Sequence, residues 1–142
     1  MSFAADLEAR LTALFSELQR ETTGDDELSR TSAAVLHMLE DEPRRVTELA
    51  DAQAVAQPTM TVLLQRLEAR GLVERRRDVG DRRVINVVIT DAGRETLAAR
   101  RARRAEALGA RLRTLTSDER AALRAALPAL DALTHHKTPA IA

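Results

Sequence analysis

Apolar residues recur with helical spacing at both ends of the chain. Near the N-terminus they return every three or four positions, with charged residues between them, which predicts a helix with one apolar face. The residues on this face are Phe3, Leu7, Leu11, Leu14, Phe15 and Leu18. A second stripe near the C-terminus consists of Leu123, Leu127, Leu130 and Leu133. Because one small domain cannot cover both stripes, we expect them to join two copies of the chain in a homodimer.

The middle of the chain predicts three helices followed by a β-hairpin. The first begins at Ser29, a favourable N-cap residue, and two shorter helices are expected over Thr47–Gln53 and Gln57–Arg70. The stretches 72–75 and 84–89 are then rich in β-branched residues and flank a segment of turn-forming residues. Such a pattern is typical of two antiparallel strands joined by a short loop.

Two more helices are expected after the hairpin. Thr90 is a suitable N-cap for a long helix that ends near Leu115, and residues 116–119 form a capping box at the start of a last helix. The fold class is therefore mainly α with a small β-hairpin, in the order of a winged helix-turn-helix with flanking helices. The expected segments are 1–28 for the N-terminal dimerisation helix, 29–90 for the winged helix-turn-helix and 91–142 for the long and C-terminal helices, all within one intertwined domain per protomer.

The composition narrows the classes of protein that fit this pattern. The 142 residues include 22 basic and 22 acidic side chains, so any interaction with a polyanion must depend on local rather than total charge. Cysteine is absent, which excludes disulfides, thiolate nucleophiles and thiol redox sensing. The sequence contains neither an apolar run long enough for a membrane span nor a signal peptide, so we expect a cytoplasmic protein.

The helix expected over Gln57–Arg70 has two faces of different character. Met60, Leu63, Leu64 and Leu67 follow helical spacing and form the face expected to be buried. The other side and its flanks carry small or hydrogen-bonding side chains at Gln57, Pro58, Thr59, Thr61, Val62, Gln65 and Arg66. Residues of these types suit a helix that reads base edges in the DNA major groove, where Gln65 can pair with adenine and Val62 can contact a thymine methyl. An ordinary amphipathic surface helix has the same pattern. This helix alone therefore does not distinguish a DNA-reading helix from a surface helix without that function.

The expected hairpin carries a cluster of five arginines. Arg75, Arg76, Arg77, Arg82 and Arg83 lie within nine positions, and the nearby acidic residues offset only part of their mutual repulsion. A thin ribbon tipped with arginine can enter the DNA minor groove, where negative potential is concentrated. The candidate DNA-binding positions of the hairpin are Arg75, Arg77, Asp81, Arg82 and Arg83. A solvated turn in an arginine-rich protein is the alternative interpretation, although the cluster directly follows a helix-turn-helix pattern.

Three segments together resemble the MarR (multiple antibiotic resistance regulator) family. They are LEARGLVER at 67–75, DVGDRR at 78–83 and VVITDAG at 87–93, and the helices on both sides also match. The resemblance implies a homodimer built from the N- and C-terminal helices that binds palindromic operators, usually as a repressor. It also implies that the recognition helix is Gln57–Arg70 and that Asp81 orients the Arg83 guanidinium in the wing. One departure is Ala56, where the family often has a Ser or Thr that caps this helix.

The resemblance further implies a small organic effector, phenolic or apolar, that binds between the DNA-binding block and the dimerisation helices. Phe15 and His37 are the candidate residues for that site, although an isolated histidine on a helix more often has a structural role. No catalytic, cofactor or metal-ligand set is visible in the sequence, which has three histidines and no cysteine, so we expect neither an enzyme nor a metalloprotein. The competing function is a winged-helix protein-interaction module, such as an anti-repressor or scaffold, which would have no need of five arginines in the wing.

Overall fold

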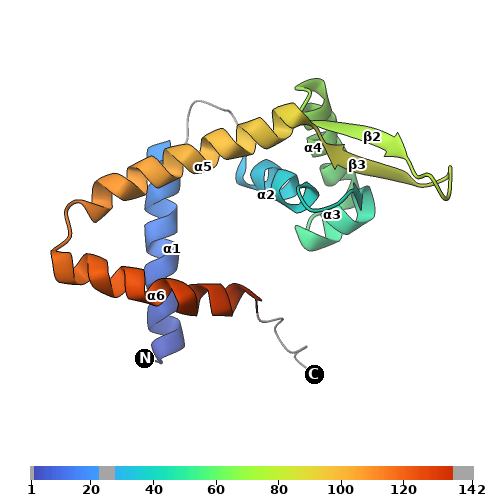
Figure 1. Ribbon diagram of the computed structural model, residues 1–142. Helices are drawn as coiled ribbons and strands as arrows, with labels where there is room; N and C mark the ends of the chain where they lie inside the picture. Colours follow the sequence, from blue (N-terminus) through green and yellow to red (C-terminus); the bar gives the residue numbers. More distant parts are fainter. Residues whose placement is uncertain (1, 23–27, 136–142) are drawn as a thin grey trace. The chain divides into compact units, whose positions relative to one another are not determined.

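The computed structural model describes residues 2–22 and 28–135, and within them it shows a mainly helical chain with one small sheet (Figure 1). In chain order the elements are α1 (Phe3–Thr22), α2 (Arg30–Leu39), β1 (Arg44–Arg45), α3 (Val46–Ala52), α4 (Gln57–Ala69), β2 (Val73–Arg77), β3 (Ile85–Ile89), α5 (Asp91–Leu112) and α6 (Ser117–His135). The chain divides into two compact units, Met1–Arg104 and Ala105–Ala142, and the boundary falls inside α5. The predicted mainly helical fold with a β-hairpin is confirmed.

The sheet has a third strand that the sequence did not predict. β2 and β3 form the expected antiparallel hairpin, with Val73 opposite Ile89 at its base. β1 is only two residues long and pairs antiparallel with β3, Arg44 lying opposite Val87, so the strand order is β1-β3-β2. Two consecutive arginines are too few to show an alternating pattern, which is why no periodicity indicated this strand. β1 attaches the segment before α3 to the hairpin.

A core of aliphatic side chains holds α2, α3, α4 and the sheet together. Its fully buried members are Leu36 of α2, Leu49 of α3, Met60 and Leu64 of α4, and Val87 of β3. The predicted apolar face of α4 is therefore largely confirmed, although Leu63 is only partly buried. Leu97 of α5 belongs to the same core, so the first turns of α5 are packed onto this block. The opposite side of α4 faces solvent.

Side-chain caps fix where two of the helices begin. The Ser29 hydroxyl accepts a hydrogen bond from the Ser32 amide at 3.1 Å, which confirms the predicted start of α2. Before α6, the Thr116 hydroxyl accepts from the Glu119 amide at 3.1 Å and the Glu119 carboxylate accepts from the Thr116 amide at 2.8 Å. The predicted capping box is thus confirmed. The N-cap residue of α4 is Ala56, which provides no side-chain cap, as its sequence implies.

Several helix ends differ from the predicted positions by a few residues. α3 spans Val46–Ala52 rather than Thr47–Gln53, and α4 ends at Ala69 rather than Arg70. α5 ends at Leu112 rather than near Leu115, because the Leu115 amide bonds only three residues back, to the Leu112 carbonyl at 3.3 Å. A tight last turn of this kind ends the regular α pattern before the apolar spacing itself ends.

Two glycines allow the hairpin and α5 to approach closely. Gly71 follows α4 with a φ of +72°, a left-handed conformation that ends the helix and leads the chain into β2. Gly93 lies in the first turn of α5, where an added Cβ would collide with the backbone carbonyl oxygen of Leu72 and the side chain of Ile89. The Thr90 hydroxyl donates to the Gly71 carbonyl at 2.6 Å and accepts from the Gly93 amide at 3.1 Å, so one side chain joins the two glycines.

We expect Gly93→Ala to lower the free energy of unfolding by about 1–3 kcal/mol, because the new methyl group must displace backbone rather than a flexible side chain. Gly109→Ala is the matched control in the same helix: its added Cβ would meet nothing closer than the end of the Arg113 side chain, at 3.9 Å. Alanine is also the better helix former, so this control should be neutral or stabilising. Urea unfolding measures both variants. Equal stabilities would contradict the close approach at Gly93.

Candidate nucleic-acid interface

The solvent-facing side of α4 carries the residues predicted to read bases. The exposed members of the set are Gln57, Pro58, Thr59, Val62, Gln65 and Arg66. Thr61 is half-buried, so it is less open to solvent than the sequence pattern implied. Because Met60 and Leu64 anchor the opposite side in the core, the exposed side chains project from a rigid helix. α4 therefore presents a polar, mostly uncharged surface with one arginine on its flank.

The loop at the tip of the hairpin is organised by the carboxylate of Asp78. Its Oδ2 atom accepts hydrogen bonds from the amides of Gly80 and Asp81, both at 3.1 Å, and its Oδ1 atom accepts from the Asn86 side-chain amide at 3.1 Å. Three donors on one carboxylate hold the turn in a single shape. Sequence reasoning identified a turn in this segment but missed this role of Asp78. The pairing of β3 with β2 is what brings Asn86 back beside it.

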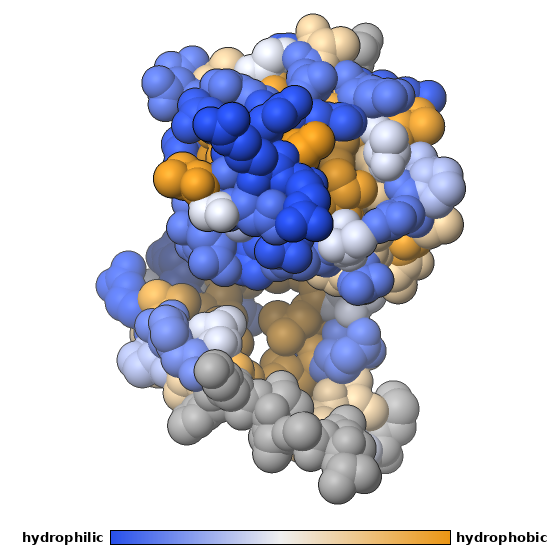
Figure 2. Space-filling model, turned by 90° about the vertical axis from the view of Figure 1, so that its right-hand side faces the viewer, coloured by the Kyte–Doolittle hydropathy of each residue, from blue (hydrophilic) through white to orange (hydrophobic). Residues whose placement is uncertain are grey.

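The predicted pair of Asp81 and Arg83 is present in this loop. Asp81 Oδ1 accepts a hydrogen bond from the Arg83 amide at 3.0 Å and lies 3.6 Å from Arg83 Nε. The Arg83 side chain is 94% exposed, so its charge extends into solvent from a fixed backbone. Figure 2 shows this end of the molecule, where hydrophilic side chains cover most of the surface around the hairpin tip and only a few apolar ones interrupt them. One of the apolar side chains near the tip is Val79, which is fully exposed.

The other arginines of the cluster differ in their partners. Arg75 Nε lies 3.6 Å from a carboxylate oxygen of Glu68, which joins the wing to α4, and Arg76 lies 3.3 Å from Glu74. Arg77 and Arg82 are exposed. Within residues 2–22 and 28–135, no ion pair joins either of them to a carboxylate. The excess positive charge of the wing is thus concentrated toward its tip.

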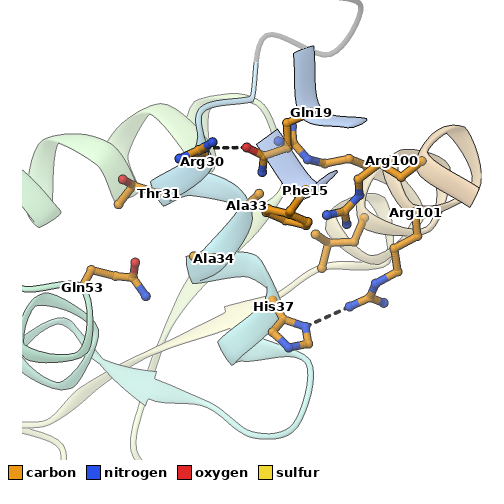
Figure 3. A pocket seen from close by; sticks show the side chains of 12 residues that line it. Phe15, Gln19, Arg30, Thr31, Ala33, Ala34, His37, Gln53, Arg100 and Arg101 are labelled. Atoms are coloured by element: carbon orange, nitrogen blue, oxygen red, sulfur yellow. Dashed lines mark hydrogen bonds between the residues drawn. The ribbon is translucent and has the colours of Figure 1, made fainter. Parts of the chain in front are cut away.

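A cavity of about 480 Å³ brings together both residues predicted to contact an effector (Figure 3). Phe15 comes from α1 and His37 from α2, and the third wall is formed by α5. The lining residues are Phe15, Gln19, Arg30, Thr31, Ala33, Ala34, His37, Gln53, Leu97, Arg100, Arg101 and Arg104. None of these described residues is acidic. Sequence reasoning missed the arginines of α5, although their spacing at positions 100, 101 and 104 could have shown that they share one helix face.

The cavity is electropositive, and its arginines affect one another. Arg104 lies over the Phe15 ring at 5.6 Å from its centroid. Burial, together with the neighbouring charges of Arg100 and Arg101, lowers the pKa of Arg104 below its usual value. The side chain of Arg30 donates to Gln19 Oε1 at 2.5 Å, so a contact between α2 and α1 forms part of the cavity wall.

Arg101 forms a bidentate ion pair at the edge of the same cavity. Its two terminal nitrogens donate to the two carboxylate oxygens of Glu40, at 3.1 and 2.5 Å. The hydrogen bond from Arg101 is the largest cause that lowers the pKa of Glu40 to about 2, and a further contact comes from His37 Nδ1, 3.0 Å from Glu40 Oε1. Glu40 in turn raises the pKa of Arg101. Arg101 therefore belongs both to the cavity wall and to a link between α5 and the end of α2.

Comparison with known sequences identifies the family. Residues 27–84 match the sequence profile of the MarR family. The chain is 32% identical over 106 residues to the HTH-type transcriptional repressor MdtR of Bacillus subtilis, an alignment that covers 69% of this chain and 68% of MdtR. The chain belongs to the MarR family. It is also 33% identical over 95 residues to YpoP, an uncharacterized HTH-type transcriptional regulator of the same organism, across 65% of this chain and 67% of the relative.

The fold of this MarR family regulator agrees with that of solved relatives. The transcriptional regulator Tm0710 of Thermotoga maritima superposes with a TM-score of 0.79 at 26% identity, covering 92% of each chain. The segments expected from the sequence to form the recognition helix and the wing are α4 and the β2–β3 hairpin. The chain is accordingly a DNA-binding transcription regulator with a winged helix-turn-helix.

The residues predicted to form the dimer are uncovered in a single chain of this MarR family member. In α1, Phe3 is 81% and Leu11 46% exposed, whereas Leu7 is half-buried. In α6, the exposed leucines are Leu123, Leu127, Leu130 and Leu133. Both helices therefore carry exposed apolar surface.

Two further features concern metal ligands and helix hydropathy. In the part of the chain that the structure covers, no three histidine or acidic side chains gather in a way that could hold a metal ion. Across residues 2–22 and 28–135, every helix is too short or too polar to cross a bilayer.

Proposed function

We propose that this MarR family regulator is a repressor that binds a palindromic operator as a homodimer and is released by a small organic effector. The observation that carries the DNA-binding geometry is the joint arrangement of α4 and the wing. Both belong to one compact unit, and the ion pair between Arg75 and Glu68 links them. A helix and a hairpin tip held at a fixed spacing can contact the major groove and a neighbouring minor groove together.

In this proposal α4 lies in the major groove and reads the operator sequence. Gln65 forms two hydrogen bonds with an adenine, and Val62 contacts a thymine methyl. Thr59, Thr61 and Arg66 bond to nearby bases or phosphates, which positions the helix on the duplex. The uncharged character of the exposed side of α4 supports this assignment, because base edges are read by hydrogen-bonding side chains rather than by charge alone.

The wing enters the minor groove with Arg83 at its leading end. Asp78 and Asp81 hold the loop and the guanidinium before DNA is bound, so less conformational freedom is lost on binding. Arg77 and Arg82 supply positive charge toward the phosphates on either side.

The homodimer rests on the apolar faces of α1 and α6, which are too exposed for a stable lone chain. A two-fold dimer must present its two recognition helices to the same face of the duplex. Half-sites about 10 base pairs apart, centre to centre, satisfy that requirement.

The effector site is the arginine-lined cavity between α1, α2 and α5, where Phe15 offers a ring surface and His37 a polar contact. An apolar or aromatic acid suits a wall of that kind. Such a ligand releases DNA only if it binds one separation of the recognition helices better than the other.

Selection of binding sites from a pool of random DNA duplexes tests the operator proposal. The expected result is a recovered sequence with dyad symmetry, bound with an affinity that falls steeply as salt rises. A pool in which no duplex is retained above background would contradict the proposal and favour the protein-interaction module. A recovered site without dyad symmetry would contradict the homodimer on a palindrome while leaving DNA binding intact.

With that operator in hand, Gln65→Ala is expected to cost about 1–3 kcal/mol of binding free energy and to relax the base preference at one pair per half-site. The reason is that the variant lacks the bidentate hydrogen bonds to the base but keeps the helix and its charge. Titration of wild type and variant against the operator and against a single-pair variant of it measures both effects. If Gln65 reads that pair, the two changes are not additive; strict additivity would assign the pair to another residue.

A further inference from the structure

The Arg101 guanidinium has neighbours on two sides. On one side it forms part of the cavity wall with Phe15, Arg100 and Arg104. On the other it holds both oxygens of Glu40, the residue that directly follows the last turn of α2. Figure 3 shows Arg101 extending from α5 toward His37 across the opening between the two helices. The Arg101 side chain is 45% exposed, so a dissolved anion can reach it without unfolding the wall.

We propose that an anionic ligand in this cavity competes with the Glu40 carboxylate for Arg101, so that binding of the ligand releases the link between α2 and α5. The proposal rests on the effector part of the proposed function and adds to it the ion pair that the ligand breaks. The Glu40 carboxylate thus competes with the ligand for the Arg101 guanidinium.

The charges around the cavity favour an anion of this kind. Four arginines line the cavity, and none of its described lining residues is acidic, so a bound anion would offset repulsion among Arg100, Arg101 and Arg104. Phe15 and Leu97 supply apolar surface for a flat organic body. A carboxylate or sulfonate on such a body can form with Arg101 the same bidentate interaction that Glu40 forms now.

The competition has a defined structural consequence. α2 and α4 share one buried core, so a change at the end of α2 is transmitted to the packing behind the recognition helix. Arg94 of α5 donates separately to the Glu40 backbone carbonyl at 3.2 Å and does not line the cavity. The ligand would therefore remove the link between the Glu40 carboxylate and Arg101 and leave the link through Arg94 in place, which changes the packing of α2 and α5 locally without separating them.

The test uses two fluorescent probes that share an anilinonaphthalene skeleton. 1-Anilinonaphthalene-8-sulfonate is anionic, and N-phenyl-1-naphthylamine lacks the sulfonate. Glu40→Gln should strengthen binding of the sulfonate by roughly three- to tenfold, because Arg101 loses its competitor, whereas Arg101→Ala should weaken it by a similar factor. Binding of the neutral probe should change little in either variant. Arg113→Ala, which removes an exposed arginine outside the cavity, is the control for loss of charge alone.

The opposite signs of the two variants are the decisive feature. If the Glu40–Arg101 pair were only a structural link, both substitutions would break it and both would shift sulfonate binding in the same direction. Shifts of equal sign, no shift in Glu40→Gln, or equal shifts for both probes would each overturn the proposal. Thermal unfolding followed by circular dichroism verifies that each variant is folded before titration.

Operator binding measured without any probe separates this inference from the proposed function. If the wild-type chain binds its operator but the variants fail the probe test, only the competition at Arg101 is wrong. If no operator is bound while the probe results hold, the proposed repressor function is wrong and the anion site stands.

Discussion

Replacing Arg83 with alanine should weaken operator binding by roughly 30- to 1000-fold while leaving folding and dimerisation nearly unchanged, because each of the two wings would then lack one charge-assisted hydrogen bond to DNA. The free protein is little affected, since the side chain is 94% exposed and its pairing with Asp81 is a surface interaction. In the proposed complex the same guanidinium would enter the minor groove already oriented, so the substitution would remove both the hydrogen bond and its preorganised geometry.

The salt dependence of binding separates this role from a general loss of affinity. The slope of log affinity against log salt should become shallower by about one unit per wing, since each variant wing neutralises one fewer phosphate. Fluorescence anisotropy over a series of salt concentrations measures the slope. Arg76→Ala is the control in the same hairpin, because Arg76 is paired with Glu74 on β2 rather than placed in the tip loop. A loss as large for Arg76 as for Arg83 would mean that the wing acts only through its total charge.

Asp81→Ala distinguishes orientation from simple electrostatics. Removing a negative charge beside DNA should strengthen binding if charge alone matters, but it should weaken binding if Asp81 holds Arg83 in position. Glu74→Ala removes an equal charge from the same hairpin without touching the tip, so it reports the purely electrostatic effect. We expect weaker binding for Asp81→Ala and slightly tighter binding for Glu74→Ala. Tighter binding by both variants would contradict the orienting role of Asp81.

The elements that depend on local periodicity could be predicted from the sequence. The buried face of α4, the Ser29 cap and the capping box at Thr116 and Glu119 all follow from residues within one helix or one turn. β1 could not be predicted in this way, since two arginines carry no pattern and their pairing with β3 depends on residues more than 40 positions away. Helix ends were also imprecise, because a last turn that tightens keeps the apolar spacing of the helix.

The candidate site likewise contains some contacts that could be expected from the sequence and others that could not. The pairing of Asp81 with Arg83 was expected from the resemblance to the MarR family, and the structure contains it. The engagement of Arg75 by Glu68 requires the wing to fold back toward α4, and the bidentate ion pair of Arg101 with Glu40 joins residues 61 positions apart. Pairings of this range are set by tertiary packing, and no spacing rule within a helix or strand reveals them. The arginine cavity was therefore found by the structure. Phe15 and His37, the two residues expected near an effector, both line it.

The largest effect is expected from charges placed on the apolar face of α6. Leu127→Glu combined with Leu130→Glu should convert the dimer to a monomer and lower operator affinity by about 10²- to 10⁴-fold, because the two recognition helices would no longer bind as one linked pair. In a single chain these leucines are 55% and 37% exposed, so the substitutions create no buried charge within the protomer itself. The cost of the new carboxylates therefore arises at the interface with the second copy.

Sedimentation velocity at micromolar concentration, together with anisotropy titration of the operator, measures both consequences. Ala121→Glu is the control, because it adds one glutamate at an exposed position on the opposite side of α6 from the leucine stripe. That variant should stay dimeric and bind its operator as the wild type does, since a surface charge far from the stripe meets only water. The double variant could also be monomeric and still bind one half-site with unchanged base preference. That result would show that α4 and the wing fold and read DNA without the partner. A wild-type chain that sediments as a stable folded monomer, or a double variant that remains a dimer, would contradict the assignment of α6 to the interface.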